Sequence, residues 1–427
     1  MTKDAEDVAS SPIRGGGGYR VLIALIIGLL AGAWAQSLGD GMREPALQVS
    51  GFIGGLWLNA LKMTVIPLVV ALLVIGIAKG AEAARAGRIA GRTVTWIVIL
   101  CTASAIFGAL MIELLTGLVP LPAAQAQAMQ AGLAGLDQST ATGPMPGIAD
   151  FFKGIIPDNV ISAAANGEVL PLVVFAMLFA LAITRIENER RRTLTAVFEA
   201  IADALLIIIG WVLWIAPLGV LALAFSVGAS AGGAAFAGLG HYIVLISVIG
   251  ILVTLWAYPI AAIWGRVGLG KFGKAMIAPQ SVAISTRSSL ASLPAMLAAA
   301  RVIGVRDQVA DVTLPLSVAL FRATGPAMNL GVAIYVAKLA GVPLTPGAIA
   351  AGVAVALATT IGSVSLPGAI SFVTAIGPIA IAMGVPIEPL AILVAVEMMP
   401  DIMRTLGNVT MDVAVTSRVE RTTPASG

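Results

Sequence analysis

Long hydrophobic runs separated by short polar segments dominate the pattern along the chain. VIPLVVALLVIGIA starts at Val65 and VLISVIGILVTLWAYPIAAIW at Val244. Such runs approach or exceed the roughly 20 residues that a helix needs to cross a bilayer. The pattern predicts helices at about 19–39, 51–78, 92–118, 157–185, 193–227 and 240–266. Glycine and proline within them are tolerated in a polytopic bundle, because neighbouring helices satisfy the freed backbone groups.

The pattern changes after residue 270. SVAISTRSSLASLPAML (281–297) and TTIGSVSLPGAISF (359–372) are too polar to span a membrane and too apolar for a surface loop. We interpret both as re-entrant hairpins, whose backbone is tolerated at membrane depth only inside protein or beside a water-filled cavity. A pair of such segments indicates the binding site of a transporter. The alternative for each is a serine-rich surface loop with a glycine turn.

The last predicted helix carries polar residues on one face. At 100° per residue, six side chains fall within an arc of roughly 100°: Glu397, Asp401, Arg404, Thr405, Asn408 and Asp412. An ionisable group at mid-membrane costs at least about 2.5–3.5 kcal/mol on insertion scales and usually marks a pathway or a site. An Asp401–Arg404 pair at i, i+3 is the alternative, but it leaves the other polar residues unexplained. We therefore predict a functional face.

The residue types on this face suggest a chemistry. The planar guanidinium of Arg404 suits a carboxylate, and Asp401 can hold an ammonium group. Asp412 with nearby carbonyl groups suits a small hard cation.

Composition supports a membrane protein and narrows its class. Of 427 residues, 59% are hydrophobic and 11% are charged, against about 25% charged in soluble domains. A net charge of +3 gives no reason to expect a nucleic-acid partner. Cys101 and His241 are the single cysteine and histidine, so a disulfide framework or a cysteine or histidine metal cluster is excluded. A membrane enzyme and a conducting pore are the competing classes. Saturable flux with counterflow would distinguish a carrier from a pore.

Basic residues in the short loops set the expected orientation. They are Lys79, Arg85, Arg88, Arg92, Arg190, Arg191, Arg192, Arg266, Lys271 and Lys274. The positive-inside rule then predicts a multi-pass protein of the cell membrane with both termini in the cytoplasm. Residues 1–18 are expected to form a disordered cytoplasmic tail, 119–156 an extracellular loop and 418–427 a cytoplasmic tail.

Four segments carry a resemblance to a known family. NGEVLPLVVFAMLFALAIT (166–184), RSSLASLP (287–294), the Pro-Gly hairpin and DIMRTLGNVTMD (401–412) resemble the dicarboxylate/amino acid:cation symporters, which include archaeal aspartate and mammalian glutamate transporters. The similarity runs from about residue 19 to the C-terminus. It implies an all-α polytopic fold of eight transmembrane helices and two re-entrant hairpins, assembled as a homotrimer in membrane lipid. The implied function is symport of an acidic amino acid or dicarboxylate without a cofactor, driven by Na⁺ or H⁺.

The resemblance also implies a division of the chain. Helices 1–2 (19–91) and 4–5 (157–239) would form a static scaffold, while helix 3 (92–118) and residues 240–417 would move as an elevator-type transport domain. Within 240–417 the expected elements are helix 6, hairpin 1 at about 272–303, helix 7 at about 310–341, hairpin 2 at about 345–384 and helix 8 at about 387–417.

Site residues carry over position by position. The resemblance implies a substrate site of Arg287, Ser289, Leu366, Asp401, Arg404, Thr405 and Asn408. It implies cation or proton coupling through Ser317, Phe321, Thr360, Ser363, Glu397, Asn408 and Asp412. Asp412 is the candidate sodium ligand.

The chain departs from the family in the seventh helix. The family has Asn-Met-Asp-Gly-Thr where this chain reads Phe321-Arg322-Ala323-Thr324-Gly325. A shifted register with Asn329 restores the asparagine but not the aspartate. Trp96, Leu100 and Cys101 stand where the third helix would supply further sodium ligands.

Arg322 is therefore a candidate internal counter-ion that replaces at least one sodium. The carrier would then be weakly sodium-coupled, proton-coupled through an acid such as Glu397, or an uncoupled exchanger of C4-dicarboxylates or neutral amino acids. In the alternative, Arg322 reaches an interface or binds helix-end carbonyl groups.

Overall fold

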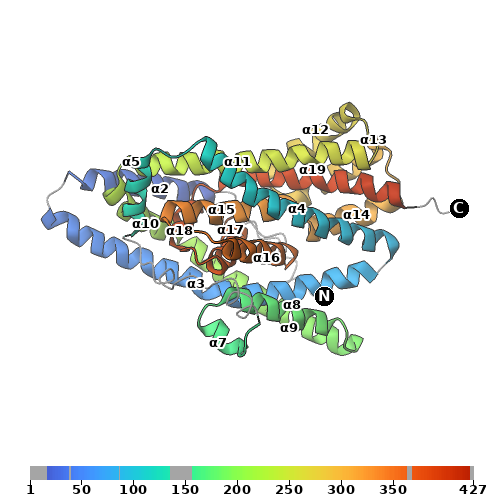
Figure 1. Ribbon diagram of the computed structural model, residues 1–427, viewed down its shortest axis with the longest axis horizontal. Helices are drawn as coiled ribbons and strands as arrows, with labels where there is room; N and C mark the ends of the chain where they lie inside the picture. The colour runs from blue at the N-terminus through green and yellow to red at the C-terminus, as the bar shows by residue number, and fades with distance from the viewer. Residues whose placement is uncertain (1–16, 38–39, 86, 135–155, 363–367, 424–427) are drawn as a thin grey trace.

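The computed structural model describes residues 17–37, 40–85, 87–134, 156–362 and 368–423. These residues form helices joined by short connections, with no strand among them, so the all-α prediction is confirmed. Figure 1 shows most of the long helices running along the longest axis. The helices are α2 (Gly17–Ala35), α3 (Asp40–Arg85), α4 (Arg88–Leu118), α5 (Ala123–Ala134), α7 (Val160–Ala165), α8 (Val169–Ile183), α9 (Asn188–Trp214), α10 (Ala216–Ala231), α11 (Ala234–Pro259) with a π-helical turn (Ile260–Trp264), α12 (Leu269–Thr286), α13 (Ser289–Ile303), α14 (Asp307–Leu320), α15 (Thr324–Ala340), α16 (Pro346–Gly362), α17 (Gly368–Ala382), α18 (Glu388–Leu393) and α19 (Met398–Thr422).

Four segments of the described chain are long and apolar enough to cross a membrane: Met42–Ala83, Arg88–Leu118, Asn188–Trp214 and Ala234–Trp264. Shorter apolar helices lie beside them, among them Val169–Ile183 and Ala216–Ala231. A multi-pass membrane protein is therefore supported. The count of eight spans with two hairpins stays a prediction.

Two predicted helices are each divided in the structure. A single helix over 193–227 is wrong, because α9 ends at Trp214 and α10 begins at Ala216. Pro217 lies in the first turn of α10, where its missing N–H costs nothing but where no helix can continue unchanged through it. The predicted helix at 157–185 is also divided, because Gly167 takes a left-handed backbone (φ 71°) between α7 and α8.

The seventh and eighth helices are broken as well. The prediction of one helix at 310–341 is wrong, because Phe321 adopts an extended backbone between α14 and α15. Pro326 favours the break, because it has no N–H for the Arg322 carbonyl and its ring crowds that carbonyl in a continuous helix. The predicted helix at 387–417 comprises α18 and α19. Since α19 continues to Thr422, residues 418–422 are helical and not part of a tail.

The helices pack in two groups. In the first, α2 packs along α10, and α3 packs against α8, α9 and α10. In the second, α11 and α14 pack against α19, α4 against α15, and α12 against α13. Close approach of α4 and α15 depends on Gly108, because a Cβ there would lie 2.3 Å from the Ala327 Cα. α3 also contacts α4, α16 and α17, so it borders both groups.

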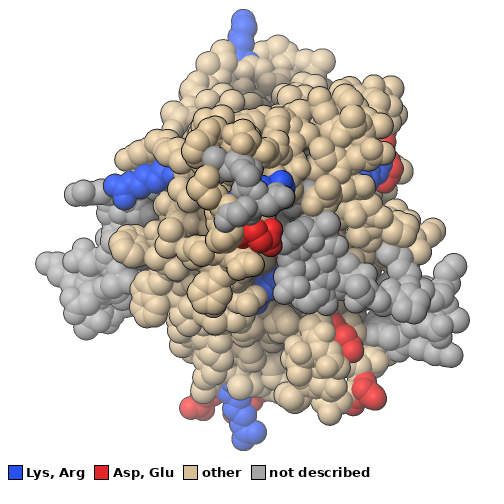
Figure 2. All heavy atoms as spheres, turned by 90° about the vertical axis from the view of Figure 1, so that its left-hand side faces the viewer, with Lys and Arg blue, Asp and Glu red and all other residues tan. Residues whose placement is uncertain are grey.

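The end of the molecule at the left of Figure 1 carries few charged side chains. Viewed from that end, the surface consists mainly of uncharged residues with scattered charges (Figure 2). Several arginines of the described chain gather at the opposite end, where Arg306 pairs with Glu420 at 2.6 Å and Arg421 donates to the Gly265 carbonyl.

Candidate functional site

The polar face of the last helix points into the protein. All six of its residues are at most 9% exposed: Glu397, Asp401, Arg404, Thr405, Asn408 and Asp412. Glu397 is the residue before α19, and the others lie within the helix. The predicted face is therefore buried between helices, which leaves each polar group to be satisfied by protein, ion or ligand.

Arg404 lies in a closed cluster of hydrogen bonds. Its Nη2 donates to Glu397 Oε1 at 2.5 Å, and its Nη1 donates to Asn329 Oδ1 on α15. The hydroxyl of Tyr242, on α11, donates to the other carboxylate oxygen of Glu397 at 2.8 Å. Residues of α11, α15 and the N-terminal end of α19 thus fix the guanidinium of Arg404, which pairs with Glu397 more closely than with Asp401 (4.0 Å).

Asp401 is held less tightly. Its carboxylate lies 4.0 Å from Arg404 Nε and 3.9 Å from Arg287 Nη1, both beyond hydrogen-bond distance. Arg287 occupies the turn between α12 and α13 with a left-handed backbone (φ 52°), which α12 and α13 hold by packing against each other. The Thr405 hydroxyl donates a hydrogen bond to the backbone carbonyl of Asp401 at 3.0 Å. The Asp401 carboxylate therefore remains available to a ligand cation.

Asn408 connects α19 to the break in the seventh helix. Its Oδ1 accepts from the Thr324 N–H at 3.0 Å and lies 2.8 Å from the Thr324 hydroxyl. The helices approach closely because residue 407 is glycine: a Cβ there would lie 2.4 Å from Thr324 Cγ2. On the other side of the break, Ser104 of α4 donates to the Ala323 carbonyl. The irregular backbone is thereby fixed in one position.

Beside this break lie buried polar atoms that have no hydrogen-bond partner. They are both carboxylate oxygens of Asp412, Nε and Nη2 of Arg322, and the hydroxyl of Ser317. Arg322 interacts electrostatically with Asp401 and Asp412, but no ion pair within 4.0 Å is formed between described residues there. Phe321 is fully buried and brings no polar side chain. Buried atoms of this kind call for an ion, a water or a ligand group.

Of the site residues predicted in the two hairpins, the structure describes Ser289 and Thr360 in addition to Arg287. Ser289 is the first residue of α13, and Ser288 caps that helix by accepting from the Ala291 N–H at 3.2 Å. Thr360 of α16 is buried with its hydroxyl beside Gly325, 3.4 Å from the position of a Cβ there. Ser363 and Leu366 lie outside the described residues.

Sequence reasoning gave no role in the site to Tyr242 or Thr324, and it gave Asn329 a different role. Tyr242 is one of four tyrosines and interrupts an apolar run, which is a signal that a search for polar residues inside spans would have found. Asn329 was considered for the sodium register, yet the structure places it on Arg404. Thr324 could be found only once the helix break was known.

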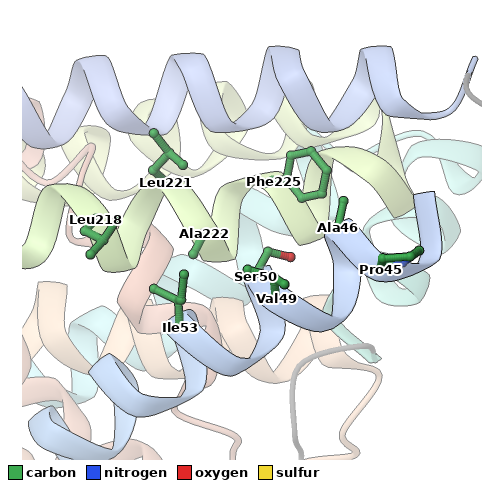
Figure 3. A pocket seen from close by; sticks show the side chains of 9 residues that line it. All are labelled: Pro45, Ala46, Val49, Ser50, Ile53, Leu218, Leu221, Ala222 and Phe225. Carbon is green, nitrogen blue, oxygen red and sulfur yellow. The ribbon is translucent and has the colours of Figure 1, made fainter. Parts of the chain in front are cut away.

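A groove between α3 and α10 has a mostly apolar lining, unlike the polar face of α19 (Figure 3). It is lined by Pro45, Ala46, Val49, Ser50, Ile53, Leu218, Leu221, Ala222 and Phe225. The Ser50 hydroxyl donates a hydrogen bond to the Leu47 carbonyl and lies 2.8 Å from Ser226 Oγ. The residues that line it carry no charge, and it shares no residue with the site on α19.

Comparisons with known proteins match nearly the whole chain. A family model described as "Sodium:dicarboxylate symporter family" matches residues 18–422. The chain is 24% identical over 400 residues to the proton/glutamate-aspartate symporter of Escherichia coli and 28% identical over 402 residues to the proton/sodium-glutamate symport protein of Bacillus subtilis, covering 92% of this chain and 89% of each relative. It is 27% identical over 339 residues to the C4-dicarboxylate transport protein of Leptothrix cholodnii, covering 77% of this chain and 70% of that relative.

Proposed function

Because the chain belongs to the sodium:dicarboxylate symporter family, whose members are transporters and not enzymes, we propose that it is a secondary active transporter of an acidic amino acid or a related C4-dicarboxylate. The observation that carries the proposal is the pair of buried groups one turn apart on α19, Arg404 and Asp401. Burying both charges in a membrane protein is costly, and a zwitterionic acid offers a partner for each.

Asp401 favours an amino acid over a plain dicarboxylate. A dicarboxylate brings no cation to a carboxylate that is already buried, whereas an ammonium group would pair with it. The relatives named above include glutamate and C4-dicarboxylate transporters, and both substrate classes carry the carboxylate that Arg404 suits. The distinction between them therefore rests on Asp401.

The test is substrate binding by the purified protein. A panel of amino acids and dicarboxylates is measured with and without sodium at two pH values, in the wild type and in Asp401→Ser. We expect aspartate or glutamate to bind best, and Asp401→Ser to lose this preference. The amino-acid assignment fails if succinate or malate competes as well as aspartate and Asp401→Ser leaves uptake intact.

Charge balance supports reduced sodium coupling. The guanidinium groups of Arg287, Arg322 and Arg404 face the carboxylates of Glu397, Asp401 and Asp412, three positive against three negative groups. A site balanced in this way does not need several cations to neutralise its carboxylates before substrate binds. Arg322 accordingly acts as a fixed internal counter-ion, and at least one sodium is dispensable.

Glu397 is the second candidate for coupling. It holds Arg404 on one carboxylate oxygen and Tyr242 on the other, so a substrate carboxylate arriving at Arg404 competes with it. A proton taken up by Glu397 would release the arginine to the substrate. Uptake that is driven by a pH gradient in the wild type and lost in Glu397→Gln would support proton coupling. Uptake that is independent of the gradient would contradict it.

We also propose an elevator mechanism in a homotrimer with cytoplasmic termini. The two helix groups support it, since α2, α3 and α7–α10 pack together while α4, α11–α17 and α19 form the group that contains the site. α18 contacts both groups, at α10 and α17, and we assign it to the second group because the chain runs from it directly into α19. The second group would move as a unit, with the hairpins α12–α13 and α16–α17 on either side of the substrate. Cross-linking of the protein in its native membrane tests the trimer.

A further inference from the structure

A single charged residue interrupts the apolar stretch of α3 between Gly51 and Ala78: Lys62. Its Nζ lies 2.6 Å from Oε1 of Glu388, the first residue of α18. The Glu388 side chain is 1% exposed, and that of Lys62 is 24% exposed. An ionised pair at this depth is unfavourable unless each charge has its partner, so each of these residues depends on the other.

The pair joins the two helix groups. Lys62 belongs to the group proposed as static, whereas Glu388 belongs to the group proposed to move, and the residues are 326 apart in the sequence. The other Oε of Glu388 has no hydrogen-bond partner. This ion pair is therefore a contact that a sliding movement would have to break.

We propose that Lys62 and Glu388 form a state-specific latch that holds the site-bearing helix group in the arrangement seen in this structure and that separates during each transport cycle. The inference rests on the proposed transport function and adds a positioning pair to it. Neither residue belongs to the substrate site, so the pair acts on the movement and not on substrate binding.

A second ion pair provides a matched control. Lys338 Nζ lies 2.6 Å from Glu113 Oε2, which is the same pair of residue types at the same distance. Both α4 and α15 belong to the proposed mobile group, so this pair should stay together throughout the cycle.

The experiment compares Lys62→Cys/Glu388→Cys with Glu113→Cys/Lys338→Cys in proteoliposomes. Each is treated with a short, reducible bifunctional thiol reagent, and treated wild type controls for the fully buried Cys101. We expect cross-linking at 62/388 to abolish aspartate uptake, with recovery after reduction and with substrate binding retained. Cross-linking at 113/338 should leave uptake unchanged.

Uptake that persists at the original rate in fully cross-linked 62/388 protein would overturn the latch while leaving the transport function standing. Failure of the transport function looks different, because the wild type and the untreated variants would then show no saturable uptake. If the double-cysteine protein does not fold, Glu388→Gln gives a second measurement. Its counterflow rate should rise about tenfold with substrate affinity preserved, and an unchanged or slower rate would overturn the latch.

Discussion

Two arginines of the site have opposite surroundings. Arg404 donates to Glu397 and Asn329, and Tyr242 secures the far oxygen of Glu397. Arg322 leaves Nε and Nη2 without hydrogen bonds, beside an Asp412 whose two oxygens also lack partners. The first arginine belongs to a closed, preorganised cluster, whereas the second interacts with its acids only across a distance.

On the proposed function, this difference would separate substrate recognition from ion coupling. A hydrogen-bonded cluster of this kind fixes the orientation of a planar guanidinium, which is what selection of a carboxylate requires. Buried groups without partners respond differently. Binding of an ion, a water or a proton there changes the free energy of the protein most, because electrostatic interactions are stronger at a low local dielectric. We therefore expect substitutions in the Arg404 cluster to change affinity, and substitutions around Arg322 and Asp412 to change ion dependence.

Arg404→Cys should have the largest effect. Losing one partner of a buried charged pair costs on the order of 2–5 kcal/mol, so binding of acidic substrates should weaken by about thirtyfold to several-thousandfold. Equilibrium binding by the purified protein measures this, and neutral amino acids are tested as replacements. Arg301→Cys is the control, since Arg301 is 59% exposed and paired with Asp307 away from the site. Normal acidic binding in Arg404→Cys would remove Arg404 from recognition.

Tyr242→Phe should come next. It deletes one hydrogen bond to the Glu397 carboxylate and keeps the ring. The free energy of substrate binding should therefore change by about 1.5–3 kcal/mol. We expect roughly tenfold to hundredfold weaker substrate binding, because a Glu397 carboxylate that has lost Tyr242 would depend more on Arg404 and compete more strongly with the substrate carboxylate. An affinity within twofold of wild type would show that the cluster tolerates a free oxygen.

Arg322→Met and Asp412→Asn should be coupled. Either change alone removes a charge that the other balances, whereas the double variant removes both. We expect a non-additive effect of about 0.5–3 kcal/mol on unfolding free energy, with the double variant more stable than the sum of the single changes predicts. Thermal unfolding of all four proteins in one detergent gives the cycle, and strict additivity would show that the two residues act independently.

Thr324→Val should have the smallest effect. It keeps the shape of the side chain and removes the hydroxyl that bonds Asn408, at a cost of about 1 kcal/mol. Melting temperature should fall slightly while substrate selectivity is preserved. A large change in selectivity would place Thr324 on the substrate.

Periodicity alone predicted the buried polar face of α19, because a 100° turn per residue brings Glu397, Asp401, Arg404 and Asp412 together wherever the helix packs. Periodicity did not determine which carboxylate pairs with Arg404. Asp401 lies one turn away and Glu397 two turns away on the same face, and the choice depends on Tyr242 and Asn329, which other helices contribute.

The breaks were harder to predict than the helices. Pro326 and Pro217 were visible, but proline is also common inside membrane helices, and α3 contains Pro45 and Pro67 without interruption. Lys62 was equally visible as a lone charge in an apolar span. Its partner could not be inferred, because no short-range pattern connects α3 to α18.

The sodium dependence of aspartate affinity, compared between the wild type and Arg322→Met, tests the counter-ion role of Arg322 most directly. A resident positive charge predicts wild-type affinity that is independent of sodium or rises with at most about the first power of its concentration. It also predicts a steeper dependence once Arg322 is replaced. Wild-type affinity that rises with about the third power of sodium concentration, and does not change in Arg322→Met, would contradict the account.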